Sequence, residues 1–158
     1  MYFWNVNKLA EDLKLNKVSE TDFKNYYIVS AIIILLSYLA LTLAPESTVS
    51  AAWASFILQI GLLISWINAI FKVNGGEKGR AFLKRIIALS LPITIQSLVL
   101  FLIVGISLQV IILVFASSLE EAMLKQLNIV IGLIFEVVIS TYIYWRIYVA
   151  VKQINQLR

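Results

Sequence analysis

The 158-residue sequence has no cysteine and no histidine, and only 14% of its residues are charged. Without thiols and imidazoles it cannot form a disulfide, a thiolate zinc site or an imidazole-ligated haem, and it has neither a His-based triad nor a thiol nucleophile. We therefore expect a nonenzymatic protein with no catalytic residues, no metal and no cofactor. The sequence also lacks a long polar region, so it has no room for a separate soluble domain.

Apolar residues make up 61% of the sequence and lie in long blocks. A helix needs about 20 mostly apolar residues to cross a bilayer. Blocks of about that length cover residues 26–44, 51–71, 86–117 and 126–145. The sequence thus predicts an all-α polytopic membrane protein in which residues 26–158 form a four-transmembrane-helix bundle.

Residues 1–25, which precede the first block, are interpreted as an amphipathic segment on the cytoplasmic side. Val6, Leu9 and Leu13 recur at helical spacing among charged residues, which predicts a short helix over residues 5–16. Two placements are open: the surface of the inner leaflet, or the cytoplasmic ends of the bundle. The charged start lacks the pattern of a cleaved signal peptide, so the first span is expected to act as the insertion signal.

The distribution of lysine and arginine predicts the orientation in the membrane. With four spans, only Lys125 of the 13 basic residues falls on one side, so the opposite side is cytoplasmic and holds both termini. A five-span alternative divides residues 86–119 around Gly105. It is disfavoured because two crossings need about 40 residues plus a turn, and because it places Arg146 outside.

Two connections are expected on the outer side. Residues 45–50 contain Pro45 and predict a tight turn between the first two spans. Ser118 and Glu121 have the spacing of a capping box, which predicts that the last helix begins outside the membrane. The hairpin of the third and fourth spans should therefore protrude by about two turns.

The cytoplasmic loop after the second span is rich in glycine and basic residues. One interpretation is that exposed backbone N–H groups and basic side chains bind an anion, such as the phosphate of an anionic lipid. The other is a helix end at Asn74 and Gly75, a turn, and basic residues that anchor the cytoplasmic side. The candidate residues for binding an anionic lipid headgroup are Gly75, Gly76, Gly79, Arg80, Lys84 and Arg85.

The same loop carries a resemblance. Its residues Asn74, Gly75, Gly76, Gly79, Phe82 and Arg85 follow the pattern N-G-G-x-x-G-x-x-F-x-x-R, and the chain also has Phe3, Trp4 and Asn5 near its start and Tyr144, Trp145 and Arg146 near its end. In these features the chain resembles a group of small, uncharacterised bacterial four-helix inner-membrane proteins. The resemblance implies a bacterial inner-membrane location and implies no activity.

Glu136 is the one ionisable residue well inside a predicted span, and a carboxyl at that depth is costly enough to mark a candidate site. Counting inward from the basic residues at the span ends places Gln96 at a similar depth, with Gln59 and Ser37 about a turn further out. Three roles are open for this intramembrane polar layer: a protonated clamp between Glu136 and Gln96, an ion or proton site, or a contact with a charged residue of another membrane protein.

Two main function classes follow from these features, and a weaker third is lipid handling or sensing through the basic loop and the amphipathic amino terminus. The first is a nonenzymatic protein that binds, stabilises or inhibits another membrane component, as an accessory subunit or an immunity protein would. The alternative is an oligomeric ion or proton channel, or a small transporter, that uses Glu136 and Gln96. The expected partners are anionic lipids on the cytoplasmic side and either another membrane protein or further copies of the chain, with no nucleic acid.

Overall fold

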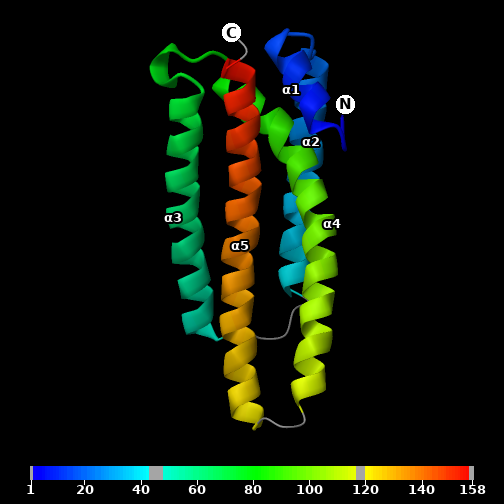
Figure 1. The fold of residues 1–158 in the computed structure, drawn as a ribbon, viewed down its shortest axis with the longest axis vertical. Coiled ribbons are helices and arrows are strands. Elements are labelled where there is room, and N and C mark those ends of the chain that lie inside the picture. The colour runs from blue at the N-terminus through cyan, green and yellow to red at the C-terminus, as the bar shows by residue number, and fades with distance from the viewer. Residues whose placement is uncertain (1, 43–47, 117–119, 157–158) are drawn as a thin grey trace.

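The computed structural model is a set of long helices that lie side by side (Figure 1). It describes residues 2–42, 48–116 and 120–156, and within these all side chains except those of residues 35, 38–42, 115, 116 and 122. This part of the chain contains no strand, which confirms the all-α class. The elements are α1 (Val6–Lys14), α2 (Glu20–Thr42), α3 (Val49–Val73), a 3₁₀ turn η1 (Gly76–Lys78), α4 (Phe82–Ala116) and α5 (Glu121–Gln156).

Three segments of the described helices are long and apolar enough to cross a membrane: Val49–Val73, Phe82–Val114 and Met123–Gln156. They correspond to the second, third and fourth predicted spans. The first predicted span, residues 26–44, corresponds to α2, which is not among the three. The structure does not describe the backbone of residues 43–44 or the side chains of residues 35 and 38–42. The search for spans covered only the described residues, so it does not include the whole of the first predicted span.

The helices form an open row rather than a closed bundle. Of the described residues, those of α3 pack against α5, those of α5 against α4, and those of α4 against α2, while α2 and α3 do not pack extensively on each other. The chain colours in Figure 1 show that α3 and α5 run in one direction and that α2 and α4 run in the other. Helix α3 of the α2–α3 hairpin therefore packs on the parallel helix α5 of the α4–α5 hairpin, and α2 packs on the parallel helix α4. Helix α3 lies at one edge of the row.

The hairpin of α4 and α5 extends beyond the start of α3 (Figure 1). Since Ser55 of α3 lies opposite Glu136 of α5, the start of α3 at Val49 is level with about residue 130. Helix α5 begins at Glu121, about 13 Å further along the axis. The α4–α5 hairpin thus extends past the start of α3, while its expected protrusion from the membrane stays a prediction, and the capping role of Ser118 and the turn at Pro45 lie outside the described residues.

The buried core lies at one end of the molecule, which we call the capped end. The capped end contains α1, η1, the starts of α2 and α4, and the ends of α3 and α5 (Figure 1), and all of these except η1 contribute buried residues to the core. Leu9, Ile70, Leu89 and Val151 are fully buried there, one from each of four helices. Towards the other end, large apolar side chains of α3, α4 and α5 are exposed. The protein thus buries its core at the capped end and presents apolar surface along the rest of its length.

Helix α1 has the amphipathic pattern that the sequence predicts. Val6, Leu9, Ala10 and Leu13 are buried, and the helix packs against α4 and α5. Asn5 caps its start by accepting a hydrogen bond from the backbone N–H of Lys8 at 2.9 Å. Of the two placements that the sequence left open, the one over the ends of the bundle is observed, because the apolar face of α1 is already covered by protein.

Candidate functional site

A line of polar side chains joins α3 to α5, and we call Ser55, Gln59, Glu136 and Ser140 the polar seam. Ser55 Oγ donates to Glu136 Oε2 at 2.6 Å, and Ser140 Oγ donates to Gln59 Oε1 at 3.0 Å. On each helix the two polar residues are four apart, which places them on one face. Because α3 and α5 run parallel, the second pair repeats the first one turn nearer the capped end.

Glu136 is the chemically distinctive member of the polar seam. It lies ten residues from Arg146, which corresponds to about 15 Å along a helix, among exposed apolar side chains such as Ile134 and Val138. Its carboxyl is half-buried, and among the described residues only Oε2 has a hydrogen-bond partner, the hydroxyl of Ser55. The second oxygen, Oε1, remains able to accept a hydrogen bond, or to donate one when the carboxyl is protonated.

Gln96 does not belong to this seam, so the expected Glu136–Gln96 pair is not formed. Gln96 Oε1 accepts from Arg146 Nη2 at 3.2 Å, and Gln96 Nε2 donates to the backbone oxygen of Trp4 at 2.5 Å. The depth count from the sequence is wrong because it began at Arg85. That residue lies within the capped end, about 16 Å before Gln96 along α4, so Gln96 is level with Arg146.

The other two members of the predicted layer also separate. Gln59 lies in the polar seam one turn from Ser55, as part of the same face of α3. Ser37 lies on α2 and is exposed, and its hydroxyl donates to the backbone oxygen of Ile33 at 2.9 Å. The structure therefore brings together Glu136 and Gln59, while Gln96 and Ser37 lie elsewhere.

Sequence reasoning missed Ser55 and Ser140, which are the hydrogen-bond donors of the seam. Both are small residues that are common in apolar helices, so neither is conspicuous alone. The available signal was the matched spacing, since Ser55 and Gln59 are four apart in one span and Glu136 and Ser140 are four apart in another. Two polar residues at helical spacing on each of two spans indicate faces that can meet.

The glycines of the loop between α3 and α4 have structural roles. Asn74 ends α3, Gly75 has φ +104° and Gly76 has φ +57°, in the region that glycine adopts without strain. A Cβ atom on Gly79 would lie 2.5 Å from the backbone oxygen of Asn74, so only glycine fits without displacement. The loop thus forms the helix end and turn that one interpretation of the sequence predicted.

Arg85 is the centre of a hydrogen-bond network at the capped end. Its side chain is only 5% exposed, and its Nη1 donates to Asn74 Oδ1 at 2.7 Å and to Asn155 Oδ1 at 2.9 Å. Asn155 Nδ2 in turn donates to the backbone oxygen of Val73 at 2.7 Å. This network joins the end of α3, the start of α4 and the end of α5, so Arg85 acts within the fold rather than as an exposed cation.

The two other basic residues proposed for anion binding differ from Arg85 in their surroundings. Lys84 forms an ion pair with Glu20 at the start of α2 and lies 5.3 Å from the centre of the Phe23 ring. Arg80 is exposed. The six candidate residues therefore do not converge as one group, because three glycines shape the turn while Arg85, Lys84 and Arg80 lie in three different environments.

Three of the described helices are long and apolar enough to cross a membrane, which supports a helical membrane protein. No protein-family model, no curated protein and no solved structure matched the chain.

Proposed function

We propose that the protein is a nonenzymatic membrane protein that binds another membrane component at the polar seam, through the carboxyl of Glu136. The observation that carries this proposal is the half-buried state of that carboxyl. One oxygen accepts from Ser55, and the other has no partner among the described residues. A carboxyl at such a depth is costly and is kept where it serves a function.

The position of the seam supports binding by a second helix. Helix α3 lies at the edge of the row and packs on α5, so its other faces are exposed. Trp53 and Phe56, which flank Ser55 on α3, are exposed, as is Ile134 near Glu136 on α5. A partner helix could cover these apolar side chains while a basic, amide or hydroxyl group pairs with Glu136. Hydrogen bonds between membrane helices contribute about 0.6–2 kcal/mol.

The proposed setting is a bacterial inner membrane that the chain crosses four times, with both termini in the cytoplasm. The capped end holds α1, the basic loop and the end of α5 (Figure 1), and the positive-inside rule favours the cytoplasm for such an end. Helix α2 runs parallel to α4 in Figure 1, which supports its assignment as the first span. Anionic lipids remain proposed partners, with exposed Arg80 as the candidate contact at the loop.

The alternative of an ion or proton channel is less well supported by the geometry. It relied on Glu136 and Gln96 as a pair, but Gln96 is bound to Arg146. The open row of helices does not by itself enclose a pathway, so several copies would be needed. Ion flux through liposomes tests this alternative: flux that is lost in Glu136→Gln would favour the channel, and absent or unchanged flux would exclude the role of Glu136 in it.

Co-purification from membranes tests the proposed function. The tagged chain, expressed at its native level, is extracted in mild detergent as wild type, as Glu136→Leu and as Ile106→Leu, a control that changes an exposed residue of α4 outside the polar seam. We expect a component that accompanies the wild type and the control but is lost from Glu136→Leu. A chain recovered alone, or a component retained equally by all three proteins, contradicts the proposal.

A further inference from the structure

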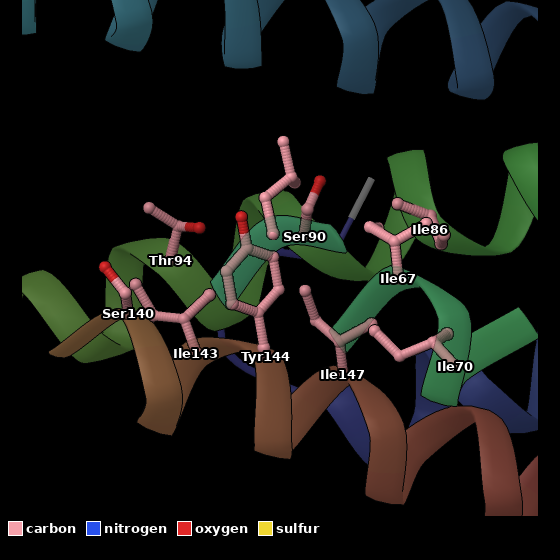
Figure 2. Close-up of a pocket in the computed structure, with 10 residues that line it drawn as sticks. Ile67, Ile70, Ile86, Ser90, Thr94, Ser140, Ile143, Tyr144 and Ile147 are labelled. Atoms are coloured by element: carbon pink, nitrogen blue, oxygen red, sulfur yellow. The ribbon is translucent and has the colours of Figure 1, made fainter. Parts of the chain in front are cut away.

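Arg146 lies where α5 meets α4, on the side opposite a cavity that these helices form with α3. Thr94 and Tyr144 line that cavity, which has a volume of about 370 Å³ (Figure 2). Gln96 and Arg146 each follow one of them by two residues, or about 200° around a helix, so they lie on the opposite flank of the α4–α5 contact. There Arg146 Nη2 donates to Gln96 Oε1 at 3.2 Å.

Neutral groups hold the guanidinium of Arg146. Besides the bond to Gln96, its Nη1 donates to the Tyr142 hydroxyl at 3.2 Å, and its central carbon lies 5.9 Å from the centre of the Tyr142 ring. Gln96 is itself held, because its Nε2 donates to the backbone oxygen of Trp4 at 2.5 Å. Among the described residues, no carboxylate forms an ion pair with Arg146. The structure thus orients this cation without neutralising its charge.

The donors that Arg146 has left favour an anion with several oxygens. A guanidinium has five N–H donors, and Gln96 and Tyr142 each take one of them, which leaves three without a partner among the described residues. The side chain is partly exposed, so a ligand has access to it. A phosphate accepts two parallel N–H bonds from a guanidinium, and such charge-assisted bonds are stronger than bonds between neutral groups.

The surroundings of Arg146 indicate that this phosphate belongs to a lipid. Trp145 is exposed next to it, and Trp4, whose backbone binds Gln96, is exposed as well; tryptophan is typical of the interface between membrane and water. Beyond Gln96, exposed apolar residues continue on the same face of α4 at helical spacing. These residues are Val99, Leu100 and Ile103. The order of cation and apolar surface matches the order of phosphate and acyl chains in a phospholipid.

We propose that Arg146 binds the phosphate of a membrane phospholipid, whose acyl chains lie along the exposed face of α4 beyond Gln96. The proposal rests on the membrane position proposed above and not on a partner at Glu136. Gln96 is a positioning residue, because it holds the guanidinium through an uncharged oxygen. Phospholipids with different headgroups share this phosphate and bind at the site, whereas diacylglycerol has the acyl chains alone and binds more weakly.

Native mass spectrometry of the full chain in mild detergent tests the site with three probes. They are phosphatidylethanolamine, diacylglycerol with the same acyl chains, and inorganic phosphate. Phosphatidylethanolamine has no net charge, so exposed basic residues such as Arg80 attract it little. The wild type should retain one phosphatidylethanolamine and bind diacylglycerol about tenfold more weakly, as expected for hydrogen bonds to a charged group. Excess inorganic phosphate should leave the lipid bound, and displacement would contradict a lipid site.

Three variants test the location. Arg146→Gln removes the cation, and Gln96→Glu places a carboxylate against it, so both should lose the preference for phosphatidylethanolamine over diacylglycerol. Arg80→Gln removes the same charge from the exposed loop and should keep the preference.

Three results overturn the proposal: equal binding of both lipids by the wild type, a preference that persists in Arg146→Gln or Gln96→Glu, or an equal loss in Arg80→Gln. If Arg146→Gln does not fold, Gln96→Glu still decides, because it removes no basic residue. None of these measurements involves the component that depends on Glu136, so the two proposals fail separately.

Discussion

Arg146 Nη2 donates to Gln96 Oε1 at 3.2 Å, and this contact fixes which parts of α5 and α4 lie at the same level. Leu91 and Ile93, just before Gln96, are fully buried, whereas Leu98, just after it, is exposed. Buried positions are frequent on α4 as far as Ser97, whereas beyond it most large apolar side chains of α4 are exposed, with the buried Ile112 as an exception. The stretch from Gln96 to the end of α4 at Ala116 spans about 30 Å, which matches the hydrocarbon thickness of a bilayer.

Cysteine labelling tests this boundary, and the absence of natural cysteine makes each introduced thiol the only one. Asn68 and Leu83 are exposed near the capped end, while Ile60 and Leu98 are exposed beyond the boundary. In inside-out membrane vesicles, a water-soluble maleimide should label Asn68→Cys and Leu83→Cys but leave Ile60→Cys and Leu98→Cys unmodified. An unlabelled Asn68→Cys would instead agree with a span over residues 51–71.

The network around Arg85 predicts a stability effect far from the polar seam. Asn155→Ala removes one of the two acceptors for Arg85 Nη1 and the donor to the Val73 backbone oxygen, so polar groups at the capped end lose partners at a cost of about 1–3 kcal/mol. Gln153→Ala, an exposed position on the same helix, should change stability by no more than about 0.5 kcal/mol. Thermal unfolding in detergent compares them, and equal melting temperatures would show that the network does not stabilise the fold.

Two glycines provide a matched test of the loop. Gly79→Ala places a methyl group 2.5 Å from the backbone oxygen of Asn74, whereas a Cβ on Gly61 meets nothing within 4 Å. Gly79→Ala should lower the midpoint of unfolding because backbone atoms must shift. Gly61→Ala should leave it unchanged or raise stability by up to about 1 kcal/mol, since alanine favours helix. Indistinguishable unfolding midpoints for the two variants would contradict the close approach at Gly79.

Local features of the fold could be predicted from the sequence because their signals are local. The spacing of Val6, Leu9 and Leu13 predicted α1, and the buried positions on that helix agree with it. Asn74 and Gly75 predicted the end of α3, and the positive φ of Gly75 agrees with a left-handed residue after the helix. In both cases a few neighbouring residues determine the conformation.

The order of the helices could not be predicted in the same way. Apolar helices in lipid have no strong polar face, so periodicity does not indicate which sides meet. Depth counts along separate spans failed for Gln96 because the first part of α4 belongs to the capped end. For the same reason the partner of Glu136, Ser55, became apparent only once α3 was placed beside α5.

Crosslinking inside the membrane tests the proposed role of Glu136 most directly. A photoreactive amino acid replaces Phe56, which is exposed next to Ser55, and in a second protein it replaces Leu102, which is exposed on α4. We predict a light-dependent adduct from position 56 whose yield falls in Glu136→Leu and is unchanged in Ile106→Leu, with no such dependence at position 102. An adduct at position 56 that is insensitive to Glu136→Leu, or no adduct there, would contradict binding through the polar seam.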